Sequence, residues 1–226
     1  MKSDEIAAVI AVRKFDKILQ DKNLLPFGNG SLLTHKIEAI QKSKSFKHVV
    51  VCSEDEEILE IAKSLNVEVL PRPDALAGPD SLFNDLVEFV STRVSVPHIA
   101  WLSVTCPLIS PSFINNAVDC YFGKLQEDFD SLITVRKVKR YLLDDNGPLN
   151  FRFDLHARNL NTLPDLYEFV NAICIAPTVA MKSWRYNWGR HPFKLQVPED
   201  MCVDICTEFE YRLCRMLYDA SSSRLN

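Results

Sequence analysis

The sequence predicts an α/β fold in which helices flank a mostly parallel sheet. Between residues 6 and 138, short apolar runs alternate with amphipathic segments of helical length. Such a rhythm implies right-handed crossovers that join parallel strands. The chain has 226 residues, of which 47% are hydrophobic and 25% charged, close to the average for globular proteins. We therefore expect one domain over residues 1–226.

The expected strands are apolar runs bounded by polar or turn-forming residues. Two of these runs contain a cysteine, Cys52 in VVVCS and Cys174 in AICIA, and we interpret both as buried core thiols. The last runs are short and follow an irregular stretch. The expected strands are 6–12, 47–52, 67–70, 98–104, 131–138, 170–176, 194–197 and 201–205.

The expected helices follow residues that can cap them. Ser31 precedes an apolar stripe with helical spacing, and Ser53 precedes a segment whose first turn is acidic, which suits the positive end of a helix dipole. A final amphipathic segment closes the chain. The expected helices are 31–44, 55–66, 80–94, 111–124 and 208–218.

Residues 141–169 interrupt this alternation. The stretch contains DDNGPL, in which Asn146-Gly147 is a hairpin signal between extended pieces. The residues that follow are polar and irregular. We interpret 141–169 as an inserted arm that projects from the domain.

Charge and cysteine content exclude several classes of protein. Lys plus Arg number 26 and Asp plus Glu 30, giving a net charge of -4, whereas a general nucleic-acid binder is usually basic. The apolar run near the start is too short to span a bilayer, so we expect a cytoplasmic protein without a membrane partner. Seven cysteines without a CxxC pair argue against a disulfide framework and a zinc site.

A basic loop follows the first expected strand. Arg13, Lys14, Lys17 and Lys22 fall within ten residues of an otherwise acidic chain. In open α/β sheets, ligands bind beyond the carboxyl ends of the strands. The loop therefore predicts a polyanion site, and the alternative is a solvated basic loop. Neither GxxxxGK[ST] nor GxGxxG is present, which excludes a P-loop enzyme and a typical Rossmann dehydrogenase.

Six segments, the first of which contains the basic loop, occur in an order that resembles one family. They run from the basic loop almost to the end of the chain: AVR with Lys17 and KN at 11–23, HKIEAI at 35–40, VVVCSEDEEI at 49–58, RP and LAG at 72–78, TCPL at 105–108, and VDICT at 203–207. Together they resemble the acylneuraminate cytidylyltransferase (CMP-sialic acid synthetase) family.

The resemblance implies a nucleotide-diphospho-sugar transferase-like fold with a projecting arm. It implies a nucleotidyltransferase that moves CMP from CTP to an anomeric hydroxyl and releases pyrophosphate. The acceptor would be an acidic sugar, a sialic-acid-like nonulosonic or ulosonic acid, and Mg²⁺ the cofactor. The resemblance also implies a homodimer whose arm reaches towards the partner's sugar site.

The resemblance also implies roles for individual residues. Positioning and charge stabilisation dominate catalysis of phosphoryl transfer. Most of the residues with an implied role are therefore cations, together with one carboxylate. The implied roles are triphosphate binding and catalysis for Arg13, Lys17 and Lys22; nucleotide recognition for Asn23, Arg72 and Ser81; acceptor binding for Thr105 and Arg158; and metal binding for Asp204.

The chain departs from the family pattern at several of these motifs. Lys14-Phe15-Asp16 replaces Gly-Gly-Ser, Ser103 replaces a Gln that contacts the acceptor, and Cys206 replaces the second metal-binding Asp. A thiol is a poor ligand for a hard cation. Two alternatives therefore stay open: a CTP-dependent nucleotidyltransferase with another acceptor, and a degenerate homologue that binds nucleotide or a partner enzyme without turnover.

Overall fold

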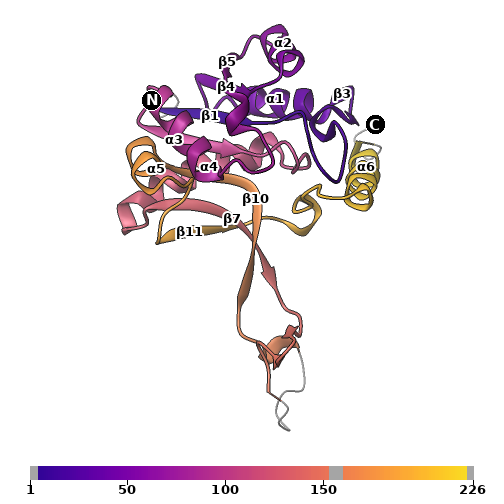
Figure 1. Ribbon diagram of the computed structural model, residues 1–226. Helices are drawn as coiled ribbons and strands as arrows, with labels where there is room; N and C mark the ends of the chain where they lie inside the picture. The colour runs from indigo at the N-terminus through magenta and orange to yellow at the C-terminus, as the bar shows by residue number, and fades with distance from the viewer. Residues whose placement is uncertain (1–4, 153–159, 223–226) are drawn as a thin grey trace.

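A seven-stranded sheet forms the centre of the computed structural model, which describes residues 5–152 and 160–222 (Figure 1). The strand order is β11-β7-β10-β6-β1-β4-β5, and within it only β10 runs antiparallel to its neighbours. The prediction of a mostly parallel sheet is thus confirmed. The strands are β1 (Ile6–Ala11), β4 (His48–Ser53), β5 (Glu68–Pro71), β6 (His98–Leu102), β7 (Ser131–Val138), β10 (Leu166–Pro177) and β11 (Pro192–Gln196).

Helices cover both faces of this sheet because side chains alternate along its strands. On β1, Ile6, Ala8 and Ile10 pack with α1, α2, α4 and α6, whereas Val9 packs with α3 and α5 on the other face. None of the helices within the described residues has the length and apolar character needed to cross a membrane. The helices are α1 (Leu32–Ser43), α2 (Glu56–Ser64), α3 (Phe83–Arg93), α4 (Pro111–Lys124), α5 (Thr178–Trp184) and α6 (Glu208–Ser222).

Local side chains set where the helices begin. Ser31 caps α1 as expected, in a capping box with Thr34. Ser53 was expected to begin the next helix, but Asp55 caps α2 by accepting a hydrogen bond from the Ile58 N–H. The third helix begins at residue 83 rather than 80, because the Ser81 hydroxyl turns back to the Gly78 carbonyl and does not cap it.

One expectation near the end of the chain was wrong, and one helix there had not been predicted. Residues 201–205 form no strand: after a short 3-10 helix (Glu199–Met201) the chain crosses the end of the sheet, where Ile205 N donates to the Thr105 carbonyl. The sequence did not predict α5, because Thr178–Trp184 is only seven residues long and has a short apolar stripe. Between the basic loop and α1 the chain forms a 3-10 helix (Lys22–Leu24) and a hairpin of β2 (Pro26–Phe27) with β3 (Gly30–Ser31).

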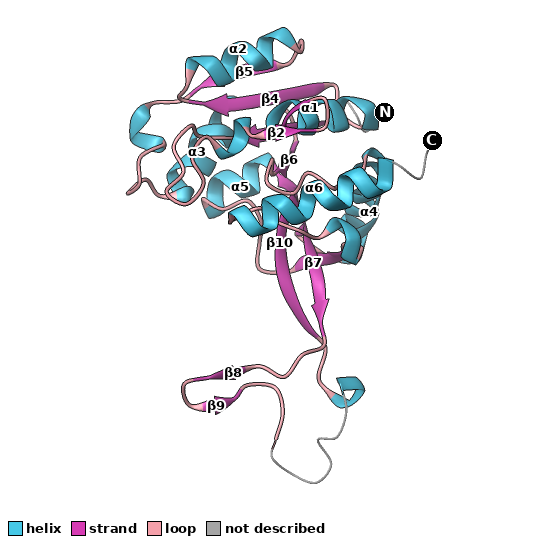
Figure 2. Ribbon diagram, turned by 90° about the vertical axis from the view of Figure 1, so that its right-hand side faces the viewer, coloured by secondary structure: helices cyan, strands magenta, loops and turns pink. Residues whose placement is uncertain are grey.

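The expected arm is a long ribbon. Strands β7 and β10 continue beyond the sheet as a two-stranded stem, in which Leu166 pairs with Val138 (Figure 1). The predicted hairpin lies at its far end, formed by β8 (Leu143–Asp144) and β9 (Gly147–Pro148) (Figure 2). The stem takes residues 166–169 into β10, so the irregular part of the arm is shorter than the predicted 141–169.

The strand order reverses between β1 and β6. From β1 the chain adds β4 and β5 on one side and then crosses to β6 on the other. Ligands in open α/β sheets bind where such a reversal occurs, beyond the carboxyl ends of the two strands. Arg13 follows β1 and Ser103 follows β6, so the fold directs attention to these two loops.

Candidate functional site

Two adjoining cavities open beyond the carboxyl ends of β1 and β6. They share Ala11, Arg13, Ser103 and Asn171. The polar cavity, of about 290 Å³, is lined further by Asp16, Lys22, Asn23, Thr105, Asp204 and Cys206. The aromatic cavity, of about 450 Å³, is lined further by Arg72, Ser81, Phe83, Trp101, Phe169 and Tyr186.

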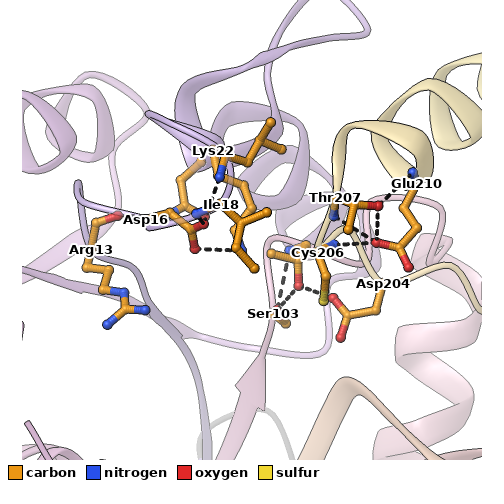
Figure 3. A network of polar contacts seen from close by, with 12 residues as sticks. Arg13, Asp16, Ile18, Lys22, Ser103, Asp204, Cys206, Thr207 and Glu210 are labelled. Atoms are coloured by element: carbon orange, nitrogen blue, oxygen red, sulfur yellow. Dashed lines mark hydrogen bonds and ion pairs between the residues drawn. The ribbon is translucent and has the colours of Figure 1, made fainter. Parts of the chain in front are cut away.

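The basic loop after β1 is held by its own side chains. Asp16 accepts hydrogen bonds from the backbone N–H groups of Ile18 and Leu19, and its carboxylate lies 2.9 Å from Lys22 Nζ (Figure 3). Partial burial alone would raise the pKa of Asp16, but these hydrogen bonds outweigh it and lower the pKa to about 2. The amide of Asn23 closes the loop by donating to the Arg13 carbonyl at 2.8 Å.

Arg13 differs from Lys14 and Lys22 because its guanidinium has no ion-pair partner among the described residues. Figure 3 shows it pointing away from the pair of Asp16 and Lys22. It is exposed and lines both cavities. A guanidinium offers a planar fork of donors that matches phosphate oxygens. Arg13 is thus placed to hold an anion that spans the two cavities.

Glu54, which sequence reasoning left without a role, joins the basic loop to Arg72. One carboxylate oxygen accepts from Lys14 N at 2.9 Å, and the other accepts from Arg72 Nε and Nη2 at 3.0 and 2.7 Å. Arg72 Nη2 also donates to the Val12 carbonyl at 3.0 Å. The Arg72 side chain is only 3% exposed. These contacts fix Arg72 in one orientation at the wall of the aromatic cavity, and within the described residues its Nη1 makes no hydrogen bond.

The loop after β6 holds Asp204. The Thr105 hydroxyl donates to Asp204 Oδ1 and lies 2.7 Å from the Ser103 hydroxyl. Asp204 comes from the segment before α6, which the Ile205 N–H ties to the same loop (Figure 3). Two segments 99 positions apart in the sequence thus place one carboxylate and two hydroxyls in the polar cavity.

A buried lysine lies beneath this loop. Lys36 on α1 is 0% exposed, and its ammonium donates to the Cys106 carbonyl at 2.8 Å. Burial lowers its pKa to about 8, although Asp204 acts in the opposite direction. The adjacent His35 contacts the Pro107 carbonyl at 3.1 Å. Sequence reasoning gave Lys36 no role, because its only signal was a lysine within an apolar helical stripe.

The donor set of the polar cavity fits Mg²⁺ only in part. Asp204 supplies a carboxylate, whereas Cys206 supplies a thiol in place of a second one, and its N–H is bonded to Glu210 at 2.8 Å. Within the described residues, no three His, Cys, Asp or Glu side chains gather as a metal site. Mg²⁺ commonly uses one or two protein carboxylates together with water and phosphate oxygens. One carboxylate with neighbouring hydroxyls therefore fits a Mg²⁺ that is held mainly by a bound nucleotide.

The structure brings most of the predicted residues together. Two exceptions are Lys17, which is exposed and lines neither cavity, and Arg158, which lies outside the described residues. The polar cavity gathers Arg13, Lys22, Asn23, Thr105 and Asp204, and the aromatic cavity gathers Arg13, Arg72 and Ser81. The aromatic walls had not been predicted as a site: Phe83 contacts Trp101 and Tyr186 edge to face, both at 5.6 Å.

Comparison with known proteins gives a consistent result. The model of a family described as cytidylyltransferase matches residues 7–150, well over half of the chain. The chain is 28% identical over 217 residues to N-acylneuraminate cytidylyltransferase of Escherichia coli O18:K1:H7, and 22% identical over 220 residues to pseudaminic acid cytidylyltransferase of Campylobacter jejuni. These matches cover 92% and 93% of the chain. The chain spans about half (51%) of the first relative and 94% of the second.

Solved structures share the fold. A CMP:2-keto-3-deoxy-manno-octonic acid synthetase complexed with CTP superposes with a TM-score of 0.70 at 12% identity, covering 96% of this chain and 99% of that one. A 4-diphosphocytidyl-2C-methyl-D-erythritol synthase from Anaerococcus prevotii gives a TM-score of 0.65 at 9% identity, with 95% and 98% covered. These likenesses confirm the predicted nucleotidyltransferase-like architecture.

Proposed function

The chain belongs to the cytidylyltransferase family, and we propose that it transfers CMP from CTP to the anomeric hydroxyl of an acidic sugar. The hydroxyl oxygen loses its proton to solvent and forms a bond to the α-phosphorus, the bond between the α-phosphorus and the oxygen of the β-phosphate breaks, and pyrophosphate leaves. The observation that carries the proposal is the convergence of Arg13, Lys22, Thr105 and Asp204 on one cavity at the reversal of strand order. The relatives named for N-acylneuraminate and pseudaminic acid suggest the class of acceptor.

The triphosphate would lie along the polar cavity. Arg13 would bind phosphate oxygens with its unpaired fork, and Lys22 would exchange the single carboxylate of Asp16 for the more highly charged triphosphate. Both cations would stabilise the charge that spreads over the phosphate oxygens in the transition state. Lys17 would join them only through a movement of the loop, since it lines neither cavity.

The nucleoside would lie in the aromatic cavity. Arg72 is held by Glu54 and Val12, and its Nη1 group remains available to the acceptor atoms of cytosine. A buried site with fixed donors rejects a base that leaves those donors unmatched. Ser81 lines the same cavity. Asn23 would contribute by holding the Arg13 carbonyl and so the conformation of the basic loop.

Asp204 would hold Mg²⁺, which when bound neutralises phosphate oxygens. Thr105 would keep the Asp204 carboxylate in position, since it donates to one of its oxygens. The acceptor would approach between Thr105, Ser103 and Asn171, at the junction of the two cavities. The aromatic side chains beyond this junction, including Tyr186, offer apolar contact to acyl groups of the sugar.

The proposal includes a homodimer formed through the arm. The arm contacts solvent with apolar side chains: Leu143 and Leu149 are each 61% exposed, and Tyr141 is 40% exposed. Apolar surface at the end of a thin ribbon is typical of an interaction site. A partner's arm, with Arg158, would then complete the acceptor site. The enzyme would work in the cytoplasm, where nucleoside triphosphates are available.

An assay of pyrophosphate release tests the proposal. The purified chain is mixed with CTP, Mg²⁺ and, in turn, N-acetylneuraminate, pseudaminate or 2-keto-3-deoxy-manno-octonate, and the CMP-sugar is identified by mass spectrometry. We expect one of these acids to give a product. Lys63→Ala, which removes an exposed cation of α2, serves as the control variant and is expected to keep full activity.

Two other outcomes would replace the proposal. Cytidylyl transfer to an acceptor without a carboxylate would favour the alternative of a different acceptor. CTP binding without product from any acceptor would favour the degenerate homologue, for which Cys206 is the specific observation.

A further inference from the structure

Lys36 is a buried charge for which the fold alone gives little reason. It lies among apolar residues of α1, whose neighbours Leu33, Ile37 and Ile40 are at most 1% exposed. Its ammonium donates a hydrogen bond to a neutral group, the Cys106 carbonyl, at 2.8 Å. An ammonium taken out of water needs a counter-charge to offset its lost hydration. An apolar side chain at this position would pack without that cost.

The counter-charge is Asp204. Cys106, whose carbonyl Lys36 binds, directly follows Thr105, whose hydroxyl donates to the Asp204 carboxylate. The Lys36 ammonium thus lies beneath the short loop that carries Thr105, close enough for the Asp204 charge to act on it. Asp204 is held from its buried side by the Thr105 hydroxyl, with the Lys36 ammonium under the same loop, while its other side lines the polar cavity.

The charges around the polar cavity balance. Arg13, Lys22, Asp16 and Asp204 line the cavity, and Lys36 and Glu210 lie next to it, bonded to residues of its wall or of the loop behind it. Three positive charges thus accompany three negative ones. Two of the carboxylates are already engaged, because Asp16 is paired with Lys22 and Glu210 binds backbone N–H groups. With Cys206 in place of a further acid, a divalent cation alone meets no excess of negative charge here.

We propose that Lys36 is a positioning residue that fixes the loop beneath Asp204 through the Cys106 carbonyl and offsets the charge of that carboxylate, so that Asp204 binds a divalent cation only together with the nucleotide. The triphosphate supplies the negative charge and the oxygen ligands that the protein lacks. This inference rests on the proposed function, because it requires a nucleotide in the polar cavity. On this account, the buried Lys36 is the reason why the metal ion binds with the nucleotide and not before it.

Titration with Mn²⁺, followed by electron paramagnetic resonance, tests the proposal without any turnover. The wild-type chain is expected to bind Mn²⁺ at least tenfold more tightly with CTP than without it. Lys36→Met, which keeps the length of the side chain and removes the charge, is expected to bind Mn²⁺ alone at least tenfold more tightly than the wild type. Lys36→Arg, which keeps the charge, is expected to behave like the wild type. If the substitution only damaged the fold around the cavity, Lys36→Met would instead bind Mn²⁺ more weakly than the wild type.

Two controls separate charge from folding. Ser43→Ala removes a buried hydroxyl at the far end of α1 and is expected to leave Mn²⁺ affinity unchanged. The melting temperature of Lys36→Met is expected to equal or exceed that of the wild type, since replacing a buried charge by a packed apolar group is often neutral or stabilising. A folded Lys36→Met that binds Mn²⁺ no more tightly than the wild type would overturn the proposal.

The wild type alone also decides the question if Lys36→Met does not fold. Equal Mn²⁺ affinity with and without CTP would contradict the inference. Failure of the proposed function is distinguishable, because it would be seen as absent product in the pyrophosphate assay while the effect of Lys36→Met on Mn²⁺ binding persists.

Discussion

The polar cavity and the arm lie on the same chain but satisfy their side chains in different ways. In the polar cavity, Asp16 pairs with Lys22, Thr105 bonds to Asp204, and Lys36 lies beneath them. In the arm, Leu143 and Leu149 face solvent. The cavity therefore has its geometry before any ligand arrives, whereas the arm has apolar surface that only another molecule can cover.

This difference separates what one chain can do from what a dimer adds. Preorganised charges need little rearrangement when a phosphate binds, so nucleotide binding is expected of a single chain. In the proposed dimer, acceptor binding would depend on the arm and hence on the partner. Substitutions in the cavity and in the arm test this contrast.

The largest effect is expected from Arg13→Ala. Arg13 is the cavity cation without an ion-pair partner among the described residues, so its loss removes a contact that is made to phosphate alone. We expect kcat/KM for CTP to fall by about a hundredfold to a thousandfold, in line with the loss of one preorganised donor to the transition state. Lys17→Ala, outside both cavities, is expected to have a smaller effect. Equal rates for Arg13→Ala and the wild type would remove Arg13 from the site.

The arm is tested by the double substitution Leu143→Ser and Leu149→Ser. Loss of two exposed apolar anchors is expected to weaken dimerisation by about 2 kcal/mol, or about thirtyfold in Kd. Sedimentation equilibrium measures this change. Val179→Ser, at a residue of α5 that is 79% exposed, is the control and should leave the dimer intact. A wild-type chain that stays monomeric at high concentration would contradict the role given to the arm.

Cys206→Asp tests the metal end of the polar cavity. A second carboxylate beside Asp204 adds a hard oxygen ligand, so we expect the Mg²⁺ concentration for half-maximal rate to fall by about tenfold. Isothermal titration with Mg²⁺ and a non-hydrolysable CTP analogue gives the same comparison without turnover. Cys206→Ser, which adds no charge, is the matched control. An unchanged Mg²⁺ requirement would mean that Cys206 does not face the metal.

The smallest effect is expected from Asp16→Asn, through the stability of the basic loop. The pKa of Asp16 is lowered from 3.8 to about 2, so its carboxylate stabilises the fold above pH 3.8 and loses this contribution as the pH falls towards 2. With allowance for solvent screening, the variant should be less stable by about 1 kcal/mol at pH 7. Urea unfolding at pH 7 and pH 2 measures it. A deficit that persists at pH 2 would contradict the role of the charge.

Much of the fold could be predicted because it depends on local patterns. Continuous apolar runs predicted β1 and β4, Ser31 predicted the start of α1, and Asn146-Gly147 predicted the hairpin in the arm. Arg13 was found because it follows a strand, and strand ends are where ligands bind in this fold class. Thr105 was assigned through the resemblance of TCPL to the family motif.

The remainder depends on contacts between distant segments. Nothing local to Glu54 shows that it will bind Arg72, and nothing local to Lys36 shows that it will lie under Cys106. Residues 201–205 were mistaken for a strand because most of them are apolar. Ile205 is buried, but its N–H donates to the Thr105 carbonyl in the loop after β6 rather than to a strand of the sheet. Such pairings become visible only once the fold has brought the segments together.

Thermal melting of the chain with CTP, UTP, ATP and GTP, each with and without Mg²⁺, tests the central claim most directly. A ligand at about 100 times its Kd stabilises the folded state by about 2.7 kcal/mol, which raises Tm by about 5–10 °C for a chain of this size. We predict such a rise for CTP, larger with Mg²⁺, and little or none for the other three nucleotides. Equal shifts for all four nucleotides, or no shift with CTP, would contradict a cytidylyltransferase site built from Arg13, Lys22 and Arg72.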